Sequence, residues 1–331
     1  MYVLGIDTSC DDTSFAILED DSRVIANTVF NQNELHKLFG GVVPEIASRK
    51  HIEYIEPLFF QFMEKCGLVP QRIDLIACTN GPGLIGSILV GLSFAKGLCL
   101  SLDKPLIGVN HIEAHAMSIF LERKVDFPFV ALVVSGGHTL ILLMEEKGNY
   151  RFLGSTRDDA AGEAFDKIAK FLNLGYPGGV AIDRISRQGL RDFVRFPRPM
   201  IDEDNFDFSF SGLKTAFINY VKKNPPNSDT LHHVVASFQE AVCEVLCVKT
   251  VKAAKKFKVK NVVLGGGVAA NRRLREMLLD AAKAYDLEIF FPSIEYCTDN
   301  AAMVAITGYY HYKIGRKSDL KLKGFSSIFS S

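Results

Sequence analysis

The chain has 331 residues, of which 48% are hydrophobic, and it carries 38 basic and 38 acidic side chains. This length and composition are sufficient for two lobes with substantial cores and exclude an intrinsically disordered chain. The zero formal charge excludes a protein that binds polyanions over its whole surface, so local patches must meet any nucleic acid. Seven cysteines with no C-x-x-C pair argue against a disulfide framework and indicate a reducing compartment.

Two features of the chain bear on localisation. The N-terminal residues contain no basic leader followed by an apolar core and a cleavage site, so no secretory signal is expected. The longest apolar run, residues 84–95, stops at Lys96 and is shorter than the roughly 20 residues of a membrane span. We therefore expect a cytoplasmic protein without membrane contact, in which this run forms a buried helix.

The first predicted element is a β-hairpin. Residues 3–6 and 15–18 are apolar runs on either side of a polar turn that contains Asp11 and Asp12. Acidic and hydroxyl side chains at such a tip either satisfy their own backbone or face a ligand. Both interpretations of the two aspartates stay open at this point.

A helix, a strand, a turn and a second helix follow the hairpin. The pattern predicts a helix over 43–66, a strand over 73–78, a glycine turn at 80–83 and a helix over 85–100. An apolar strand that ends at Gly108 then runs directly into another helix. This order is typical of an α/β lobe.

The helix after Gly108 carries a histidine pair that indicates a metal site. His111 and His115 are four residues apart, so their directions differ by only about 40° and both imidazoles leave one helix face. Two ligands do not hold a metal tightly, and such a pair is often an ordinary surface feature. Glu113 lies about 200° away, so the general base that a zinc peptidase places next to its first histidine is missing.

The same order of elements occurs a second time. Residues 129–134 and 140–144 predict a second hairpin. Strand, glycine turn, helix, strand and helix then follow at 261–264, 265–267, 269–284, 288–291 and 299–312. The duplication predicts two α/β lobes that face each other across a cleft. Lobe I is expected at 1–127, with a C-terminal helix at about 300–331 returning to it, and lobe II at 128–299, with a mainly helical insert at about 156–251.

The duplication also suggests a third metal ligand. The element that matches the helix of His111 and His115 opens at Thr298, and this correspondence predicts that Asp299 lies near both imidazoles across the cleft. Two histidines and one carboxylate, with positions left for substrate, are typical of catalytic zinc or non-haem iron. The alternative for Asp299 is an acid that caps or begins the last helix.

Two glycine turns are candidate nucleotide loops. Gly265-Gly266-Gly267 precedes a helix, and Ser135-Gly136-Gly137 forms a hairpin tip, so both bring backbone amides close to a ligand. No Walker lysine follows either turn, which excludes a P-loop. Asn271 contacts a base or ribose, or else satisfies the start of its own helix. Asp166 and Asp183 in the insert hold hydroxyl groups, or else are solvated.

The motifs as a set resemble one family, the bacterial tRNA N6-adenosine threonylcarbamoyltransferases (TsaD), formerly labelled O-sialoglycoprotein endopeptidases. The resemblance covers nearly the whole chain. It is carried by GIDTSCDDT at 5–13, PEIASR at 44–49, NHIEAH at 110–115, VSGGHT at 134–139, GEAFDK at 162–167, FSGLKT at 210–215, GGGVAAN at 265–271 and CTDN at 297–300. It implies the actin/hexokinase/Hsp70-like (ASKHA) fold. Asp12 is one departure, because relatives often have Glu there.

The resemblance also implies a reaction, a metal and partners. His111, His115 and Asp299 are expected to bind one divalent metal, Fe²⁺ or alternatively Zn²⁺. The implied substrate contacts are Val134, Ser135, Gly136, Gly137, His138, Asp166, Gly179, Asp183 and Asn271, beside the nucleotide loop Gly265, Gly266 and Gly267. The family transfers a threonylcarbamoyl group from threonylcarbamoyl-AMP to N6 of adenosine 37 in tRNAs reading ANN codons. Its bacterial members act with a TsaB-like paralogue and a TsaE-like P-loop ATPase.

The catalytic base is not evident from the residues. His138 and Asp11 are the nearest candidates. Two other functions compete with the transferase. The two-lobe pattern alone equally suits an ATPase or sugar kinase, and the former family label suggests a peptidase, which the direction of Glu113 argues against.

Overall fold

The protein is described from a computed structural model that covers residues 1–37, 39 and 41–327. The chain divides into two compact units. The first unit comprises Met1–Lys124 together with Thr298–Ser331, and the second comprises Val125–Cys297. Asp299, placed at the end of lobe II by the sequence pattern, therefore belongs to the first unit together with His111 and His115.

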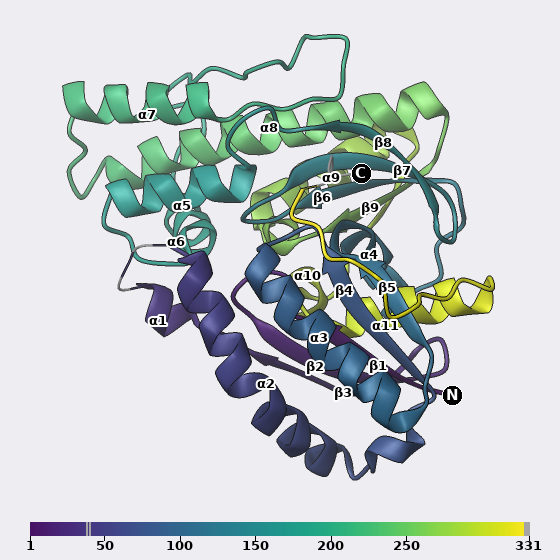
Figure 1. Ribbon diagram of the computed structural model, residues 1–331. Helices are drawn as coiled ribbons and strands as arrows, with labels where there is room; N and C mark the ends of the chain where they lie inside the picture. The colour runs from purple at the N-terminus through teal and green to yellow at the C-terminus, as the bar shows by residue number, and fades with distance from the viewer. Residues whose placement is uncertain (38, 40, 328–331) are drawn as a thin grey trace. The chain divides into compact units, whose positions relative to one another are not determined.

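The first unit is built on a five-stranded sheet with the strand order β3-β2-β1-β4-β5 (Figure 1). The first three strands are antiparallel, and β4 and β5 continue the sheet in parallel. The strands are β1 Tyr2–Asp7, β2 Thr13–Glu19, β3 Arg23–Phe30, β4 Leu75–Gly81 and β5 Leu106–Asn110. The helices are α1 Asn33–Lys37, α2 Pro44–Cys66, α3 Ile85–Leu102, α4 His111–Met117 and α11 Ala301–Lys313, with 3₁₀ turns η1 Pro70–Arg72 and η2 Ser118–Leu121.

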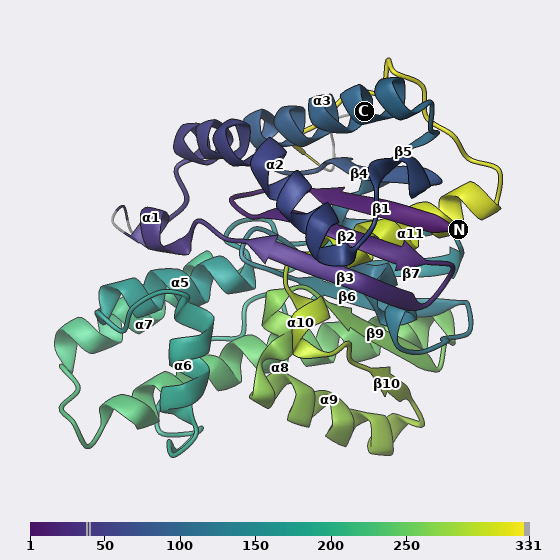
Figure 2. The same cartoon turned by 90° about the horizontal axis from the view of Figure 1, so that it is seen from below.

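Alternating residues of β1 face helices on the two sides of this sheet. Leu4 and Ile6 belong to a core formed with α2 and α3, which cover one face (Figure 2). Gly5 points to the other face, where a Cβ atom would lie 2.1 Å from the carbonyl oxygen of Ala301 at the start of α11. The missing side chain lets α11 approach the sheet closely, and Gly308 does the same against Ala77. The approach sets the position of the segment that precedes α11.

The apolar helix α3 has an exposed outer face. Only a third of its residues are buried, on a face formed by Ser87, Ile88, Gly91, Leu92, Ala95 and Cys99. Leu89 and Leu100 are 49% and 68% exposed. The predicted helix is therefore present, but only one of its faces is buried. By length and composition alone α3 is also the one described helix that is long and apolar enough to cross a membrane.

The second unit repeats the topology of the first. Its sheet has the order β10-β9-β6-β7-β8, in which β6, β7 and β8 are antiparallel and β9 and β10 are parallel additions. The duplicated two-lobe α/β fold is thus confirmed. The strands are β6 Phe129–Val134, β7 Thr139–Glu146, β8 Asn149–Ser155, β9 Asn261–Gly265 and β10 Glu288–Phe290. The helices are α5 Ala161–Phe171, α6 Gly178–Ser186, α7 Ser211–Lys223, α8 Leu231–Phe257, α9 Arg272–Tyr285 and α10 Ile294–Cys297, with the 3₁₀ turn η3 Gly267–Ala270.

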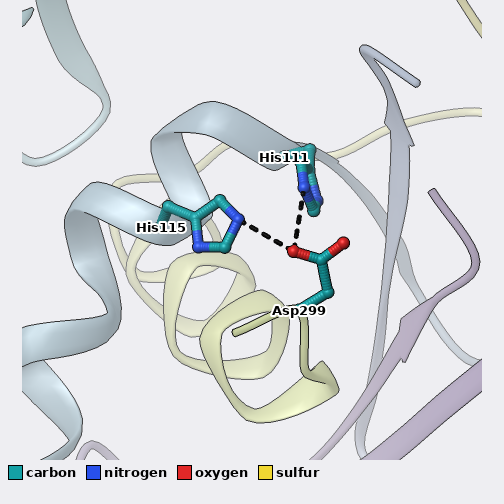
Figure 3. Close-up of side chains that lie close together, drawn as sticks. All are labelled: His111, His115 and Asp299. Carbon is teal, nitrogen blue, oxygen red and sulfur yellow. Dashed lines mark hydrogen bonds and ion pairs between the residues drawn. The ribbon is translucent and has the colours of Figure 1, made fainter. Parts of the chain in front are cut away.

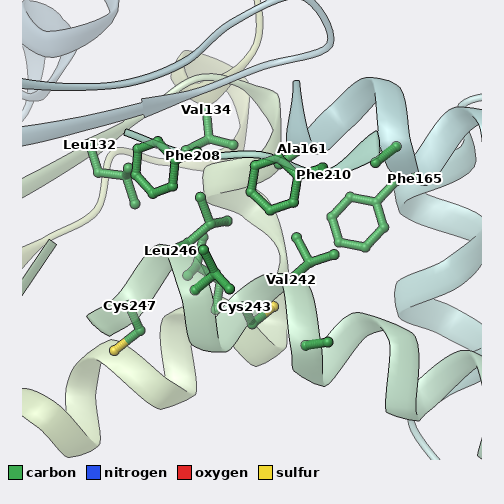
Figure 4. Packing of buried hydrophobic residues seen from close by; sticks show 14 of the residues in the cluster. Leu132, Val134, Ala161, Phe165, Phe208, Phe210, Val242, Cys243, Leu246 and Cys247 are labelled. Carbon is green, nitrogen blue, oxygen red and sulfur yellow. The ribbon is translucent and has the colours of Figure 1, made fainter. Parts of the chain in front are cut away.

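Phenylalanines pack among aliphatic side chains in the core of the second unit (Figure 4). Phe165 of α5 contacts Phe238 of α8 edge to face, with ring centroids 5.9 Å apart. Phe208 and Phe210 pack in the same cluster as Leu132 of β6. This core packs α5 and α8 against the sheet, and α5 borders the predicted loop at 135–137 through Gly162.

Each sheet has an outer strand that the sequence pattern missed. β3 and β8 pair with β2 and β7, but most of their residues are partly or fully exposed. Because neither strand buries a full face, neither shows the apolar run or strict alternation that predicts a strand.

Candidate functional site

The histidine pair lies on a short helix whose start is fixed by Asn110. The Asn110 Oδ1 atom accepts hydrogen bonds from the backbone N–H groups of Ile112 and Glu113 at 2.9 and 3.3 Å. Every residue of α4 is buried, including His111 and His115. Because α4 is short and its buried positions include polar side chains, contacts with the rest of the protein stabilise it more than helix propensity does.

Asp299 lies beside both imidazoles (Figure 3). Its Oδ1 atom is 3.1 Å from Nε2 of His115 and 3.6 Å from Nε2 of His111. Asn300, not Asp299, is the N-cap of α11, because its Oδ1 accepts a hydrogen bond from Met303 N at 3.0 Å. The alternative role of Asp299 as a helix cap is therefore wrong.

The spacing of the three side chains fits a metal ion. One ligand atom from each of His111, His115 and Asp299 lies within 4.8 Å of the other two. Two ligand atoms held tetrahedrally at about 2.1 Å from a zinc or iron ion are about 3.4 Å apart, and the observed separations of 3.1 and 3.6 Å lie on either side of that value. A nitrogen, nitrogen and oxygen donor set suits Zn²⁺ or Fe²⁺.

A further carboxylate, Asp7, faces His111 from the end of β1. Its Oδ2 atom lies 3.5 Å from His111 Nδ1, and both side chains are buried. Burial opposes the charged imidazole, but Asp299 and Asp7 outweigh it and raise the pKa of His111 to about 9. Burial together with the neighbouring His111 lowers the pKa of His115, although Asp299 opposes this shift. Sequence analysis did not single out Asp7, whose one signal is an acid at a strand end.

The hairpin tip adds two more acids, held in place by a buried histidine. His51 of α2 bonds Thr13 Oγ1 through Nδ1 at 2.7 Å and the Cys10 carbonyl oxygen through Nε2 at 2.9 Å. Burial, together with Asp11, Asp299 and Asp7, raises the pKa of Asp12 to about 8. Burial, together with Asp11, Asp299 and Asp12, raises the pKa of Cys10 well above its ordinary value, which argues against a thiolate nucleophile.

Asp12→Asn is expected to stabilise the metal-free protein increasingly as the pH rises. The unfolded chain releases the Asp12 proton near pH 4 and the folded protein releases it near pH 8. The contribution of Asp12 to the stability of the wild type therefore falls as the pH rises between these values. The difference in unfolding free energy between variant and wild type should therefore grow from pH 4 to pH 8, by at most about 1.4 kcal/mol per pH unit, and then level off. Urea titrations with chelator present measure it.

Asp192→Asn, at an exposed position, is the matched control for this charge removal and should show no such trend. Unfolding free energies that stay parallel for Asp12→Asn and wild type between pH 4 and pH 8 would contradict the raised pKa.

In the second unit, glycines bring the predicted nucleotide loops into contact. A Cβ atom on Gly266 would lie 2.3 Å from the carbonyl oxygen of Val134, and one on Gly162 would lie 2.4 Å from that of Ser135. Ser135 Oγ accepts a hydrogen bond from the His138 N–H group at 3.1 Å, which closes the hairpin tip. The backbones of β6, η3 and α5 therefore converge, and the exposed Gly136 and Gly137 lie at the tip.

The polar residues predicted to contact substrate are held in different ways. Asp166 Oδ1 accepts the Gly178 N–H group at 2.7 Å, and Asp166 also bonds Gly179, yet burial raises its pKa. Asp183 Oδ1 is buried and has no hydrogen-bond partner within the described chain, which suits a ligand contact. Asn271 caps α9 and donates to Gln239 at 3.0 Å, so its side chain is engaged by the protein itself. Their contact with substrate stays a prediction.

The predicted site residues thus form two sets, one in each unit. The first set lies in the first unit, where Asp7 is close to His111, His115 and Asp299. The hairpin tip of the same unit carries Asp11 and Asp12. The second set comprises Val134, Ser135, Gly136, Gly137, His138, Asp166, Gly179, Asp183, Gly265, Gly266, Gly267 and Asn271, all in the second unit.

Comparison with known proteins identifies a matching family. The family model described as "TsaD: tRNA N6-adenosine threonylcarbamoyltransferase" matches residues 23–306. A protein of Syntrophus aciditrophicus with that enzyme name is 49% identical over 329 residues, which cover 98% of this chain and 97% of the relative. A protein of the same name from Thermosipho africanus is also 49% identical over 329 residues, with 99% of each chain covered.

Solved structures of low sequence identity share the fold. HypF of T. kodakarensis superposes with a TM-score of 0.64 at 16% identity, covering 94% of this chain and 48% of that one. A component of the (R)-2-hydroxyglutaryl-CoA dehydratase of Acidaminococcus fermentans superposes with a TM-score of 0.57 at 16% identity, covering 95% and 98%. These structural similarities concern the fold alone.

Proposed function

Since the chain belongs to the tRNA N6-adenosine threonylcarbamoyltransferase family and forms N6-threonylcarbamoyladenosine in tRNA, we propose that it does so with one divalent metal held by His111, His115 and Asp299. Fe²⁺ is favoured and Zn²⁺ is the alternative. The observation that carries the proposal is the spacing of the three donor atoms within 4.8 Å of one another. The surrounding acids add support. Neighbouring carboxylates raise the pKa of His111 against the effect of burial and add to burial in raising that of Asp12, so the site holds buried acids whose charge a cation would offset.

The proposed donor is threonylcarbamoyl-AMP. The adenine N6 amino group is a poor nucleophile, since its lone pair is delocalised into the ring, so the acyl group must be activated. In the proposed step N6 attacks the carbamoyl carbon, the bond from that carbon to the phosphate oxygen breaks, and AMP leaves. The metal, when bound, supplies a Lewis acid for the carbonyl or phosphate oxygens. The tRNAs proposed as substrates are those that read ANN codons, modified at adenosine 37.

The loops of the second unit are proposed to hold the AMP portion. The backbone amides of Ser135 to Gly137 and of the Gly265 to Gly267 turn suit the phosphate. The Asp183 carboxylate, with its unpartnered Oδ1 atom in the described chain, suits a ribose hydroxyl. His138 and Asp11 remain the proposed bases for the N6 proton, since each lies at a hairpin tip.

Removal of the metal tests the proposal. The chain is treated with chelator, supplied with threonylcarbamoyl-AMP, tRNA and its partners, and assayed by mass spectrometry for the modified nucleoside. Modification should fall to background and return when Fe²⁺ or Zn²⁺ is added back. Equal modification by metal-depleted and metal-loaded protein would reject the metal, although the transferase assignment itself would stand.

We further propose that a TsaB-like paralogue docks on the outer groove between α2 and α3. The groove is lined from α2 by Ser48, Ile52, Ile55, Glu56, Phe59 and Phe60, and from α3 by Gly86, Leu89, Val90, Ser93, Phe94, Gly97 and Leu98. Ile52 and Phe60 are 66% and 58% exposed, and Leu89 also reaches solvent. Large apolar side chains gathered in this way are typical of an interaction surface, and a paralogue of like fold would offer a matching pair of apolar helices.

Leu89→Glu is expected to weaken binding of the paralogue by at least tenfold, because a buried carboxylate without a partner is costly at an interface. Leu100→Glu is the matched control, since Leu100 is exposed on α3 but does not line the groove. Titration calorimetry with the purified paralogue measures both. Equal affinities for Leu89→Glu and wild type would show that the paralogue binds elsewhere.

The remaining proposals concern the P-loop ATPase and the compartment. A TsaE-like ATPase is proposed to act on the assembled pair, because this chain has glycine turns but no Walker lysine. None of the seven cysteines forms a disulfide, and the substrate is tRNA. Both facts support a cytoplasmic enzyme. The proposed role of the ATPase is tested in strains that lack it, where tRNA modification should be lost.

A further inference from the structure

Glu113, the acidic residue between the two histidines, forms a buried hydrogen-bonded pair with His311. Its Oε1 atom lies 2.8 Å from His311 Nε2. Glu113 is 2% exposed and His311 is 5% exposed. Glu113 belongs to α4 and His311 to the last turn of α11. The pair thus joins the helix of the histidines to the helix that follows Asp299.

This pair and the metal site hold α4 on opposite faces. Glu113 is two residues from both His111 and His115, so it leaves the helix about 200° away from them. The chain segment that begins with Asp299 contacts the histidine face, and the same segment contacts the opposite face through His311. Any rotation of α4 about its axis that moves the imidazoles relative to Asp299 therefore also separates Glu113 from His311.

The chemistry of the pair fits positioning better than stabilisation. Buried polar pairs are often no more stabilising than apolar side chains of similar volume, because both groups must leave water, whereas they can fix one arrangement among several. A pair of leucines would fill this space without a directional contact. The close contact of Glu113 and His311 gives α4 a defined rotation.

We infer that Glu113 and His311 are positioning residues that set the angle at which His111 and His115 meet Asp299, and hence the affinity and geometry of the metal site. The inference rests on the metal centre proposed above. Residues that orient metal ligands from outside the coordination shell commonly change metal affinity ten- to a hundredfold when replaced.

Co²⁺ binding to the purified full chain tests the inference, with affinity from competition titration and geometry from the visible absorption spectrum. The double variant Glu113→Leu/His311→Leu is expected to unfold at a temperature close to that of wild type but to bind Co²⁺ at least tenfold more weakly, with an altered spectrum. Glu113→Gln keeps a hydrogen bond to His311 and should stay within about threefold of wild type. If the leucine pair does not fold, Glu113→Gln/His311→Leu, which leaves an uncharged amide, takes its place with the same expectation.

Thr307→Val is the control on the same helix. Thr307 is buried on α11, and within the described residues its hydroxyl group bonds only its own helix, at Met303 O, so Co²⁺ affinity and spectrum should not change. A folded double variant with wild-type affinity and spectrum would overturn the inference. Wild-type protein that does not bind Co²⁺ at all would instead overturn the metal centre.

Discussion

Alanine at His111 or His115 is expected to lower tRNA modification by at least about a hundredfold and to abolish tight metal binding in parallel. Even residues outside the coordination shell cost ten- to a hundredfold when replaced, so loss of a ligand should exceed that range. Each imidazole supplies one donor atom to the group within 4.8 Å. Quantitative mass spectrometry of tRNA nucleosides and metal analysis of the purified chain measure the two losses.

His232→Ala is the control for this pair, because His232 is a partly exposed histidine of the second unit and should keep both metal content and modification. Urea denaturation of each metal-free variant checks that it is still folded, because the buried imidazole of His111 lies beside Asp7 and Asp299 and its removal also costs stability. Folded His111→Ala protein that still modifies tRNA at the wild-type rate would remove the metal centre from the mechanism.

Gly266→Ala is expected to destabilise the second unit by about 3 kcal/mol or more and to prevent adenylate binding. Gly266 has φ 88° and ψ 158°, a conformation that costs other residues about 1–3 kcal/mol. The added Cβ would also lie 2.3 Å from the Val134 carbonyl oxygen, and such overpacking typically costs another 1–3 kcal/mol. Both nucleotide loops must then shift. Urea denaturation measures the loss of stability, and titration with AMP measures the loss of nucleotide binding.

Gly136→Ala is the matched control, since a Cβ atom there has open space and the residue is exposed. It should leave stability within about 0.5 kcal/mol of wild type. Equal stability of Gly266→Ala and Gly136→Ala would mean that the two loops do not pack as described.

The spacing of residues along the chain was sufficient to predict much of the candidate site. The i, i+4 histidine pair places two imidazoles on one face in any α-helix, so this part follows from helix geometry. The duplicated order of hairpin, strand, glycine turn and helix predicted the two sheets of matching topology. It also predicted Asp299 as a third ligand, although Asp299 belongs to the first unit and not to the second.

Other features depend on contacts between segments far apart in the chain. Asp7 lies close to His111 because β1 and β5 both adjoin β4 in one sheet. The two residues are far apart in the sequence, so no local pattern predicts their contact. The outer strands β3 and β8 escaped prediction because exposure removes the apolar signal, and the open face of α3 because periodicity reports apolar character but not what covers it.

The sequence by itself determined the class of fold, the glycine loops and the direction in which His111 and His115 leave their helix. These depend on backbone geometry and on the repeat of apolar residues, which act over a few positions. Only the tertiary structure decided the surroundings of those histidines, with Asp7 on one side and Glu113 bonded to His311 on the other. Burial and shifts in pKa depend on which side chains are in contact after folding, and the pattern of residues along the chain does not specify those contacts.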